Sequence, residues 1–216
     1  MWFMYFVNAF ANSATANLTP FVVSVYNGHS LLTAIYIVSN IMSGVFYLPV
    51  AKTLDVFGRA YGFAVMVGVA TIGLILMATT NNIPTYGAAQ VFYSVGFSGM
   101  IYSVDVITAD SSTLKSRGLA YAFTASPYMI TAFAGPKVSD LFYYRVSWRW
   151  GFGCFTIILP FVALPLFLNL YIHLRRAQKN GLLLKESSGR SLLQSLWFYV
   201  VEFDRKSPLD PAQSSC

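Results

Sequence analysis

Residues 48–63 read LPVAKTLDVFGRAYGF, and they place three charged side chains between two long apolar blocks. Residues 1–51 and 60–104 carry no formal charge. Asp55 and Arg59 are four residues apart with Gly58 between them, so they are close enough to pair across one tight turn. The flanking blocks are too long for the core helices of a soluble domain. The stretch therefore has the pattern of a short polar loop between two membrane spans.

The composition indicates an integral membrane protein whose solvent is the lipid bilayer. Hydrophobic residues make up 56% of the 216 residues and charged residues 10%, against about 25% charged in ordinary soluble domains. The net charge of +6 comes from bases in loops between apolar runs, without interleaved aromatic residues, so a nucleic-acid partner is not predicted. Cys154 and Cys216 form neither a disulfide framework nor a C-x-x-C pair.

Apolar segments long enough to cross a membrane occur six times along the chain. About 20 residues are needed to cross roughly 30 Å of hydrocarbon. The predicted spans are Trp2 to about Tyr26, Leu31 to Ala51, Ala60 to Thr79, Tyr86 to Val104, Gly118 to Pro136 and Trp150 to about His173. We therefore predict an all-α transmembrane bundle over residues 1–173. Residues 174–216 are predicted to form a basic cytoplasmic tail, with an amphipathic interfacial helix over 192–203.

The basic residues predict the orientation of these spans. If the N-terminus is cytoplasmic, eleven Lys and Arg residues fall on the inner side and three on the outer side. This asymmetry fits the excess of positive charge in cytoplasmic loops. Both termini are therefore predicted to face the cytoplasm.

Polar side chains recur at helical spacing in two of the spans. The first span carries Asn8, Asn12, Thr15 and Thr19, and the fourth carries Gln90, Ser94, Ser98 and Tyr102. The third and sixth spans are plainer, as expected of lipid-facing helices. Unpaired polar groups are costly in hydrocarbon, so the two stripes predict either a shared polar cavity or interhelical hydrogen bonds. Similar stripes on the first and fourth spans also fit a three-plus-three repeat.

Glycine and proline predict how the helices pack and bend. Glycines that would let helix backbones approach closely are Gly44, Gly62, Gly68, Gly73, Gly96 and Gly99. Pro127 removes an intrahelical hydrogen bond in the middle of the fifth span, so it predicts a kink that is either architectural or exposes carbonyls to a cavity. Gly135-Pro136 is interpreted as the outer end of the same helix.

Asp105 is the acidic residue closest to the polar stripe of the fourth span. Acids inside a membrane are candidates for a proton relay, but Asp105 could equally form a structural ion pair with Arg59 across the cytoplasmic face. Asp110 and Arg117 are interpreted as ordinary loop charges. No grouping of Cys, His and carboxylates has the spacing of a metal site, so iron is expected only as a ready-made chelate.

Four stretches together carry a resemblance to one family of transporters. They are residues 48–63, AAQVFYSVGFSGMIYSVDVITADSS at 88–112, SRGLAYAFTASPYMITAFAGP at 116–136 and SWRWGFGCFTIILPFVALPLF at 147–167. These resemble fungal siderophore-iron transporters of the major facilitator superfamily, and the similarity extends to about Asp204. The first stretch is similar to the loop signature G-x-L-A-D-x-x-G-R-[KR] of that superfamily, although Ala51, Thr53 and Ala60 depart from it.

The resemblance implies one six-span half of a major facilitator fold that imports ferric siderophore chelates with protons across a fungal plasma or endosomal membrane. No cofactor is implied. Substrate sits between two halves in such folds, so the chain is expected to be an N-terminal half whose site a second half or a homodimer would complete. The candidate cavity residues are Asn8, Asn12, Thr15, Gln90, Ser94, Ser98, Tyr102, Ser126 and Tyr128, and Asp55, Gly58 and Arg59 are the candidate cytoplasmic gate.

An enzyme is not predicted, because no nucleophile elbow, P-loop, paired carboxylates or dinucleotide turn is present in a suitable setting. The alternative function is a six-span membrane protein that transports nothing itself and associates with or regulates a full-length transporter.

Overall fold

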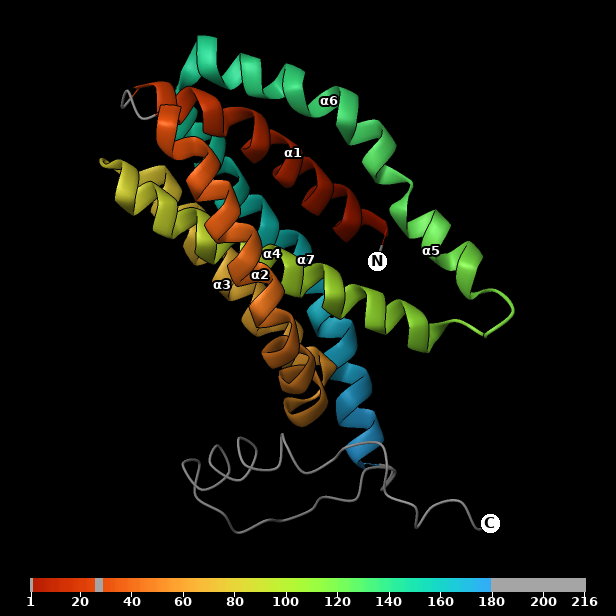
Figure 1. The fold of residues 1–216 in the computed structure, drawn as a ribbon. Helices are drawn as coiled ribbons and strands as arrows, with labels where there is room; N and C mark the ends of the chain where they lie inside the picture. The colour runs from red at the N-terminus through yellow and green to blue at the C-terminus, as the bar shows by residue number, and fades with distance from the viewer. Residues whose placement is uncertain (1, 26–28, 180–216) are drawn as a thin grey trace, which may run out of the picture. The chain divides into compact units, whose positions relative to one another are not determined.

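The computed structural model describes residues 2–25 and 29–179, and its secondary structure there is helical (Figure 1). The elements are α1 Trp2–Val25, α2 His29–Phe57, α3 Arg59–Thr79, α4 Ile83–Ser111, α5 Arg117–Ala125, α6 Pro127–Leu141, a π-helical turn at Phe142–Val146 and α7 Trp148–Lys179. The all-α prediction is confirmed for these residues. The predicted tail helix over 192–203 lies outside the described residues.

Four of the described helices are long and apolar enough to cross a membrane. They cover Leu31–Leu54, Arg59–Thr79, Ile83–Ser111 and Trp148–Arg176. Helix α1 has the length, at 24 residues, but it is not among these four. The predicted fifth span is divided into two shorter helices, α5 and α6. Length and composition thus support four of the six predicted spans.

The predicted loop after the second span is a single residue. Helix α2 continues through Lys52 and Asp55 to Phe57, and only Gly58 separates it from α3. Gly58 has φ 84° and ψ 154°, a backbone region that is essentially restricted to glycine. Residues 52–57 contain no helix breaker, so the helix ends at the first residue that can reverse the chain. The predicted short turn is confirmed, but its charged residues Lys52, Asp55 and Arg59 lie in the two helices and not in a loop.

The predicted break in the fifth span is confirmed, and its predicted end is wrong. Helix α5 ends at Ala125 and α6 begins at Pro127, whose ring nitrogen has no hydrogen to donate. Helix α6 does not end at Gly135-Pro136 but continues to Leu141. Beyond Pro136, the Ser139 hydroxyl lies within hydrogen-bond distance of two carbonyls, that of Gly135 in its own helix at 2.9 Å and that of Ala14 in α1 at 3.2 Å. The contact with Ala14 holds the last turns of α6 against α1 and offsets the helix-breaking tendency of the proline.

Helices α3 and α4 approach so closely that a side chain would not fit at several glycines. A Cβ atom added at Gly96 would lie 2.3 Å from the Ala70 nitrogen, and one added at Gly73 would lie 2.5 Å from the Tyr93 nitrogen. The predicted close packing is confirmed at Gly73 and Gly96. It is also confirmed at Gly62 and Gly99, where an added Cβ would lie 2.6 Å from the Leu54 side chain and 2.5 Å from the Met66 side chain. It is wrong for Gly44 and Gly68, which have nothing within 4 Å.

The remaining packing places α1 near the middle of the bundle. Helix α6 runs along α1, as Figure 1 shows, while α7 contributes Phe155, whose ring lies 5.7 Å from that of Phe10. Helix α2 packs on α4, yet only 6% of the residues in its most apolar stretch are buried, against 44% in that of α3. The third span was expected to face lipid, but the close contact with α4 makes it one of the better buried helices.

Replacing Gly96 with Ala tests the close contact of α3 and α4. The added methyl group would overlap the Ala70 backbone, and overpacking of this kind costs about 1–3 kcal/mol. We expect Gly96→Ala to lower the melting temperature of the detergent-solubilised protein. Gly68→Ala is the matched control, because its Cβ would meet nothing within 4 Å. Equal melting temperatures for the two variants would contradict the contact.

Candidate functional site

The polar stripe of α1 faces α4 through tyrosines that were not part of the predicted stripe. Thr19 shares a hydrogen bond with the hydroxyl of Tyr86 at 2.8 Å. One turn further along, the buried hydroxyls of Thr15 and Tyr93 lie near each other, although neither has a hydrogen-bond partner within the described residues. Nearer the other end, Tyr5 reaches Asp105. The two helices therefore run antiparallel and are bridged by tyrosine side chains at three levels.

The predicted cavity residues of α1 and α4 differ in burial and surroundings. Asn8, Thr15 and Gln90 are buried, and Asn12, Ser94, Ser98 and Tyr102 are half-buried. The ring of Tyr102 packs edge-on against Tyr47 of α2, with the ring centres 6.0 Å apart. Tyr102 thus faces α2, whereas Tyr86 and Tyr93 take the positions opposite α1.

Several buried polar atoms have no hydrogen-bond partner among the described residues. They include Asn8 Oδ1, Thr15 Oγ1, Gln90 Oε1 and the Tyr93 hydroxyl, and also the hydroxyls of Ser39 and Ser43 on α2. An unsatisfied buried polar group costs about 1–3 kcal/mol. Such groups are stabilised when water or a polar ligand reaches them. The Thr19–Tyr86 bond is interhelical, which is one of the two alternatives that the sequence left open. The shared polar cavity stays a prediction.

Asp105 accepts hydrogen bonds from two other helices. The Tyr5 hydroxyl of α1 donates to its carboxylate Oδ1, and the Tyr121 hydroxyl of α5 donates to its backbone carbonyl at 3.2 Å. Tyr128 of α6 packs edge-on against the Tyr5 ring, with centres 6.5 Å apart. Four helices therefore converge on this one acid.

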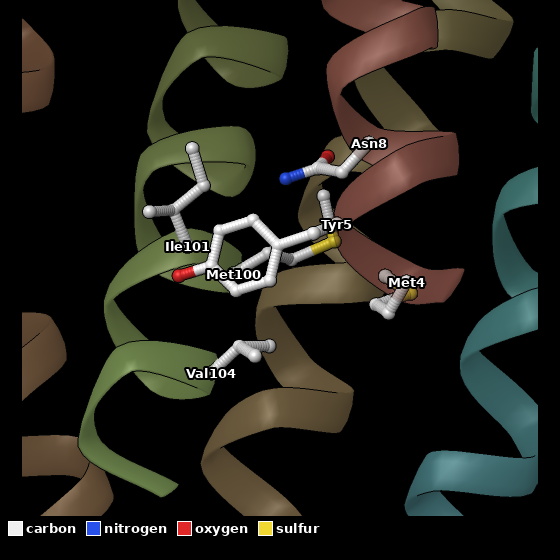
Figure 2. A pocket seen from close by; sticks show the side chains of 6 residues that line it. All are labelled: Met4, Tyr5, Asn8, Met100, Ile101 and Val104. Atoms are coloured by element: carbon white, nitrogen blue, oxygen red, sulfur yellow. The ribbon is translucent and has the colours of Figure 1, made fainter. Parts of the chain in front are cut away.

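The space beside Tyr5 is a small, partly open pocket between α1 and α4. It is lined by Met4, Tyr5, Asn8, Met100, Ile101 and Val104. Figure 2 shows the Tyr5 ring and the Asn8 amide reaching from α1 toward the α4 side of the pocket. Its free space is too small for a water molecule. In this conformation the Asn8 carbonyl is therefore buried without a partner.

The break between α5 and α6 lies beside the beginning of α1. The Trp2 indole nitrogen donates to the Ser126 hydroxyl at 3.0 Å, and that hydroxyl donates to the Phe123 carbonyl at 2.8 Å. Ser126 and Tyr128 are both half-buried. The two predicted cavity residues next to Pro127 thus contact the helix that carries the first polar stripe.

The candidate gate residues are placed differently from the prediction. Arg59 forms an ion pair with Asp110, not with Asp105. Asp110 was interpreted as a loop charge, but α4 extends to Ser111 and brings it to the start of α3. Gly58 forms the turn itself. Asp55 lies in α2, and its side chain is outside the described part of the structure.

Two further arginines hold helix ends, and the sequence analysis assigned neither of them a partner. Arg117 donates to the Ala109 carbonyl at 3.2 Å. At the opposite ends of the helices, Arg149 donates to the Thr80 carbonyl at 3.1 Å and to Asn81 Oδ1 at 2.9 Å. The Arg149 guanidinium also lies 5.1 Å from the Trp148 ring centre. These contacts fix the turns around the bundle.

Comparison with known proteins gives a consistent result across the described bundle. The model of the Major Facilitator Superfamily matches residues 1–205. The chain is 55% identical over 205 residues to MFS siderochrome iron transporter D of Aspergillus fumigatus. The matched region covers 94% of the chain and 34% of that relative. It is 51% identical, with the same coverage, to siderophore iron transporter mirB of Emericella nidulans. The chain spans about a third of the length of these relatives. No solved structure matches it.

The Arg59–Asp110 pair is expected to contribute little to stability. The two side chains are 42% and 50% exposed, and pairs with this exposure are typically worth less than about 1 kcal/mol. We expect Arg59→Gln and Asp110→Asn to lower the melting temperature of the detergent-solubilised protein slightly and equally, and added salt to reduce the effect. A large loss of stability that salt does not change would contradict this expectation.

Proposed function

The chain belongs to the major facilitator superfamily, and from this premise we propose that it forms part of a transporter that imports ferric siderophore chelates together with protons. The observation that carries the proposal is the 55% identity over 205 residues to a protein named as a siderochrome iron transporter. Iron would enter as a chelate, as a substrate of the transporter.

We further propose that the chain crosses the membrane six times, with both termini in the cytoplasm and with its spans arranged as a three-plus-three repeat. Helix α1 would be the first span, and α5 with α6 the fifth. The location of α1 between α4 and α6 supports this, because a helix shielded by others tolerates polar residues that lipid-facing helices do not. The membrane is proposed to be a plasma or endosomal membrane.

The substrate cavity is proposed to lie where α1, α4 and the α5–α6 break meet. Asn8 and Gln90 offer buried amide groups whose oxygens have no partner among the described residues, and Thr15 offers a hydroxyl. A large polar chelate needs several such groups at once, with aromatic rings such as Tyr128 to pack against. Substrate sites of this fold class lie between two bundles, so we propose that a second half or a second copy completes the cavity.

Asp105 is the proposed proton-coupling group. Its carboxylate is half-buried, and among the described residues its side chain has a tyrosine donor but no ion pair. An acid inside a helical bundle without a fixed cation can gain and lose a proton as its surroundings change. The pairing of Arg59 with Asp110 supports the relay over the structural ion pair considered for Asp105.

Uptake of iron-labelled siderophores tests the transport proposal directly. The chain would be expressed in yeast that lacks its own siderophore transporters, and its abundance in the membrane would be measured by immunoblot. We expect uptake above the vector control that a protonophore abolishes. Abundant protein without uptake, combined with co-purification of a full-length relative, would instead support a regulatory partner.

Replacing Asp105 with Asn tests the proton-coupling role in the same assay. The Asn side chain keeps the shape of the Asp side chain and can accept the Tyr5 hydrogen bond, but it cannot take up and release a proton. We expect Asp105→Asn to reduce proton-dependent uptake to near background while membrane abundance and chelate binding remain. The control is Asp140→Asn, an exposed acid at the other end of the bundle. Normal uptake by Asp105→Asn would remove Asp105 from the relay.

A further inference from the structure

Helices α1 and α4 are tied by two tyrosine hydroxyls with different partners. Tyr5 of α1 donates to the Asp105 carboxylate, whereas Tyr86 of α4 shares its hydrogen bond with the neutral hydroxyl of Thr19. Tyr5 is 6% exposed and Tyr86 is 1% exposed. The two ties are therefore alike in burial and in the helices they join. The two hydrogen bonds differ in their partners: the Asp105 carboxyl group can be charged or neutral, whereas the Thr19 hydroxyl is always neutral.

The groups that face Asp105 from the neighbouring helices are tyrosines. Tyr5 of α1 and Tyr121 of α5 donate to it, and Tyr128 of α6 lies close enough to sense its charge. Tyr47 of α2 contacts Tyr102, which precedes Asp105 on α4. The base of α3 nearest in sequence, Arg59, is paired with Asp110. Among the described residues, no cation is paired with Asp105 to hold its charge when Tyr5 moves away.

We propose that Tyr5 is a positioning residue that couples the protonation of Asp105 to the separation of α1 and α4, an inference that rests on the transport function proposed above. A hydrogen bond to an ionised carboxylate is roughly twice as strong as one to a neutral acceptor. The ionised Asp105 therefore holds Tyr5 and keeps the two helices together. Protonation removes the charge, weakens the bond and releases α1.

The pocket beside Tyr5 indicates what this release would uncover. Its lining includes both Tyr5 and Asn8, one turn apart on α1, and Figure 2 shows both side chains on the α4 side of that helix. The Asn8 carbonyl is buried there without a partner among the described residues, so widening the pocket until it admits water or a polar ligand removes an unfavourable state. Protonation of Asp105 and access to Asn8 are thereby linked through Tyr5.

Cysteine labelling measures this opening without relying on transport. In the chain with Cys154 and Cys216 changed to Ser, Met100→Cys places a thiol in the pocket lining, at a position that is 0% exposed. Its reaction rate with a water-soluble maleimide in detergent is divided by that of Leu114→Cys, at a position that is 85% exposed, because thiolate formation itself depends on pH. We expect the ratio to rise about fivefold when the pH is lowered far enough to protonate Asp105, as a charge-assisted bond becomes a neutral one.

Tyr5→Phe and Asp105→Asn are the test variants, and Tyr86→Phe is the matched control. Tyr5→Phe is expected to give a high labelling ratio at every pH, because the ring remains and the bond is lost. Asp105→Asn is expected to remove the pH dependence, because its side chain does not titrate. Tyr86→Phe is expected to keep the pH dependence of the parent. Retained pH dependence in Tyr5→Phe, or an equal loss of it in Tyr86→Phe, would overturn the proposal.

Uptake and labelling separate this inference from the transport proposal. If uptake requires Asp105 but Tyr5→Phe labels like the parent, transport stands and the role of Tyr5 is refuted. If labelling follows the expected pattern in a chain that shows no uptake, the role of Tyr5 in joining α1 to α4 stands, and the failure lies with transport.

Discussion

A polar group on an apolar helix must find its partner inside the bundle, because the hydrocarbon around the bundle offers none. This constraint explains the place of α1, which carries the most polar stripe and lies between α4 and α6. It also explains why that stripe meets tyrosines. A tyrosine combines an apolar ring, which packs between helices, with a hydroxyl that reaches a threonine or a carboxylate. In both the Thr19–Tyr86 and the Tyr5–Asp105 contacts, a tyrosine hydroxyl pairs with a polar group of the facing helix.

The sequence predicted those features of the fold that follow from single residues. Pro127 divides the fifth span because it lacks a backbone hydrogen, and Gly96 marks the closest approach of α3 and α4. It did not predict the helix ends, because nothing in residues 52–57 breaks a helix and because the Ser139 contact with Ala14 carries α6 past Pro136. The ends depend on tertiary contacts that local sequence does not contain.

The candidate site was predicted in part, and the error has a geometric cause. Residues spaced by four in α4 share a face, and Gln90, Ser94, Ser98 and Tyr102 were grouped on that basis. The structure turns Tyr86 and Tyr93 toward α1 and places Tyr102 against α2. Tyr5 was missed because an aromatic residue near the start of an apolar span has the pattern of an ordinary packing residue. Tyr5 and Asp105 are far apart in the sequence, and only their contact in the folded structure assigns Tyr5 a polar role.

The unequal distribution of charge along α4 has a further consequence. Near its end, Asp110 is neutralised by Arg59 at a half-exposed surface, where water screens both charges. Less than two turns earlier, Asp105 is more buried, and among the described residues it accepts hydrogen bonds from tyrosines and forms no ion pair. A fixed cation would keep Asp105 ionised and would oppose protonation, whereas a hydroxyl stabilises the charge less and can leave. In the transport proposed above, the two acids of α4 therefore have different tasks: Asp110 keeps a constant contact with Arg59, and Asp105 takes up and releases the proton.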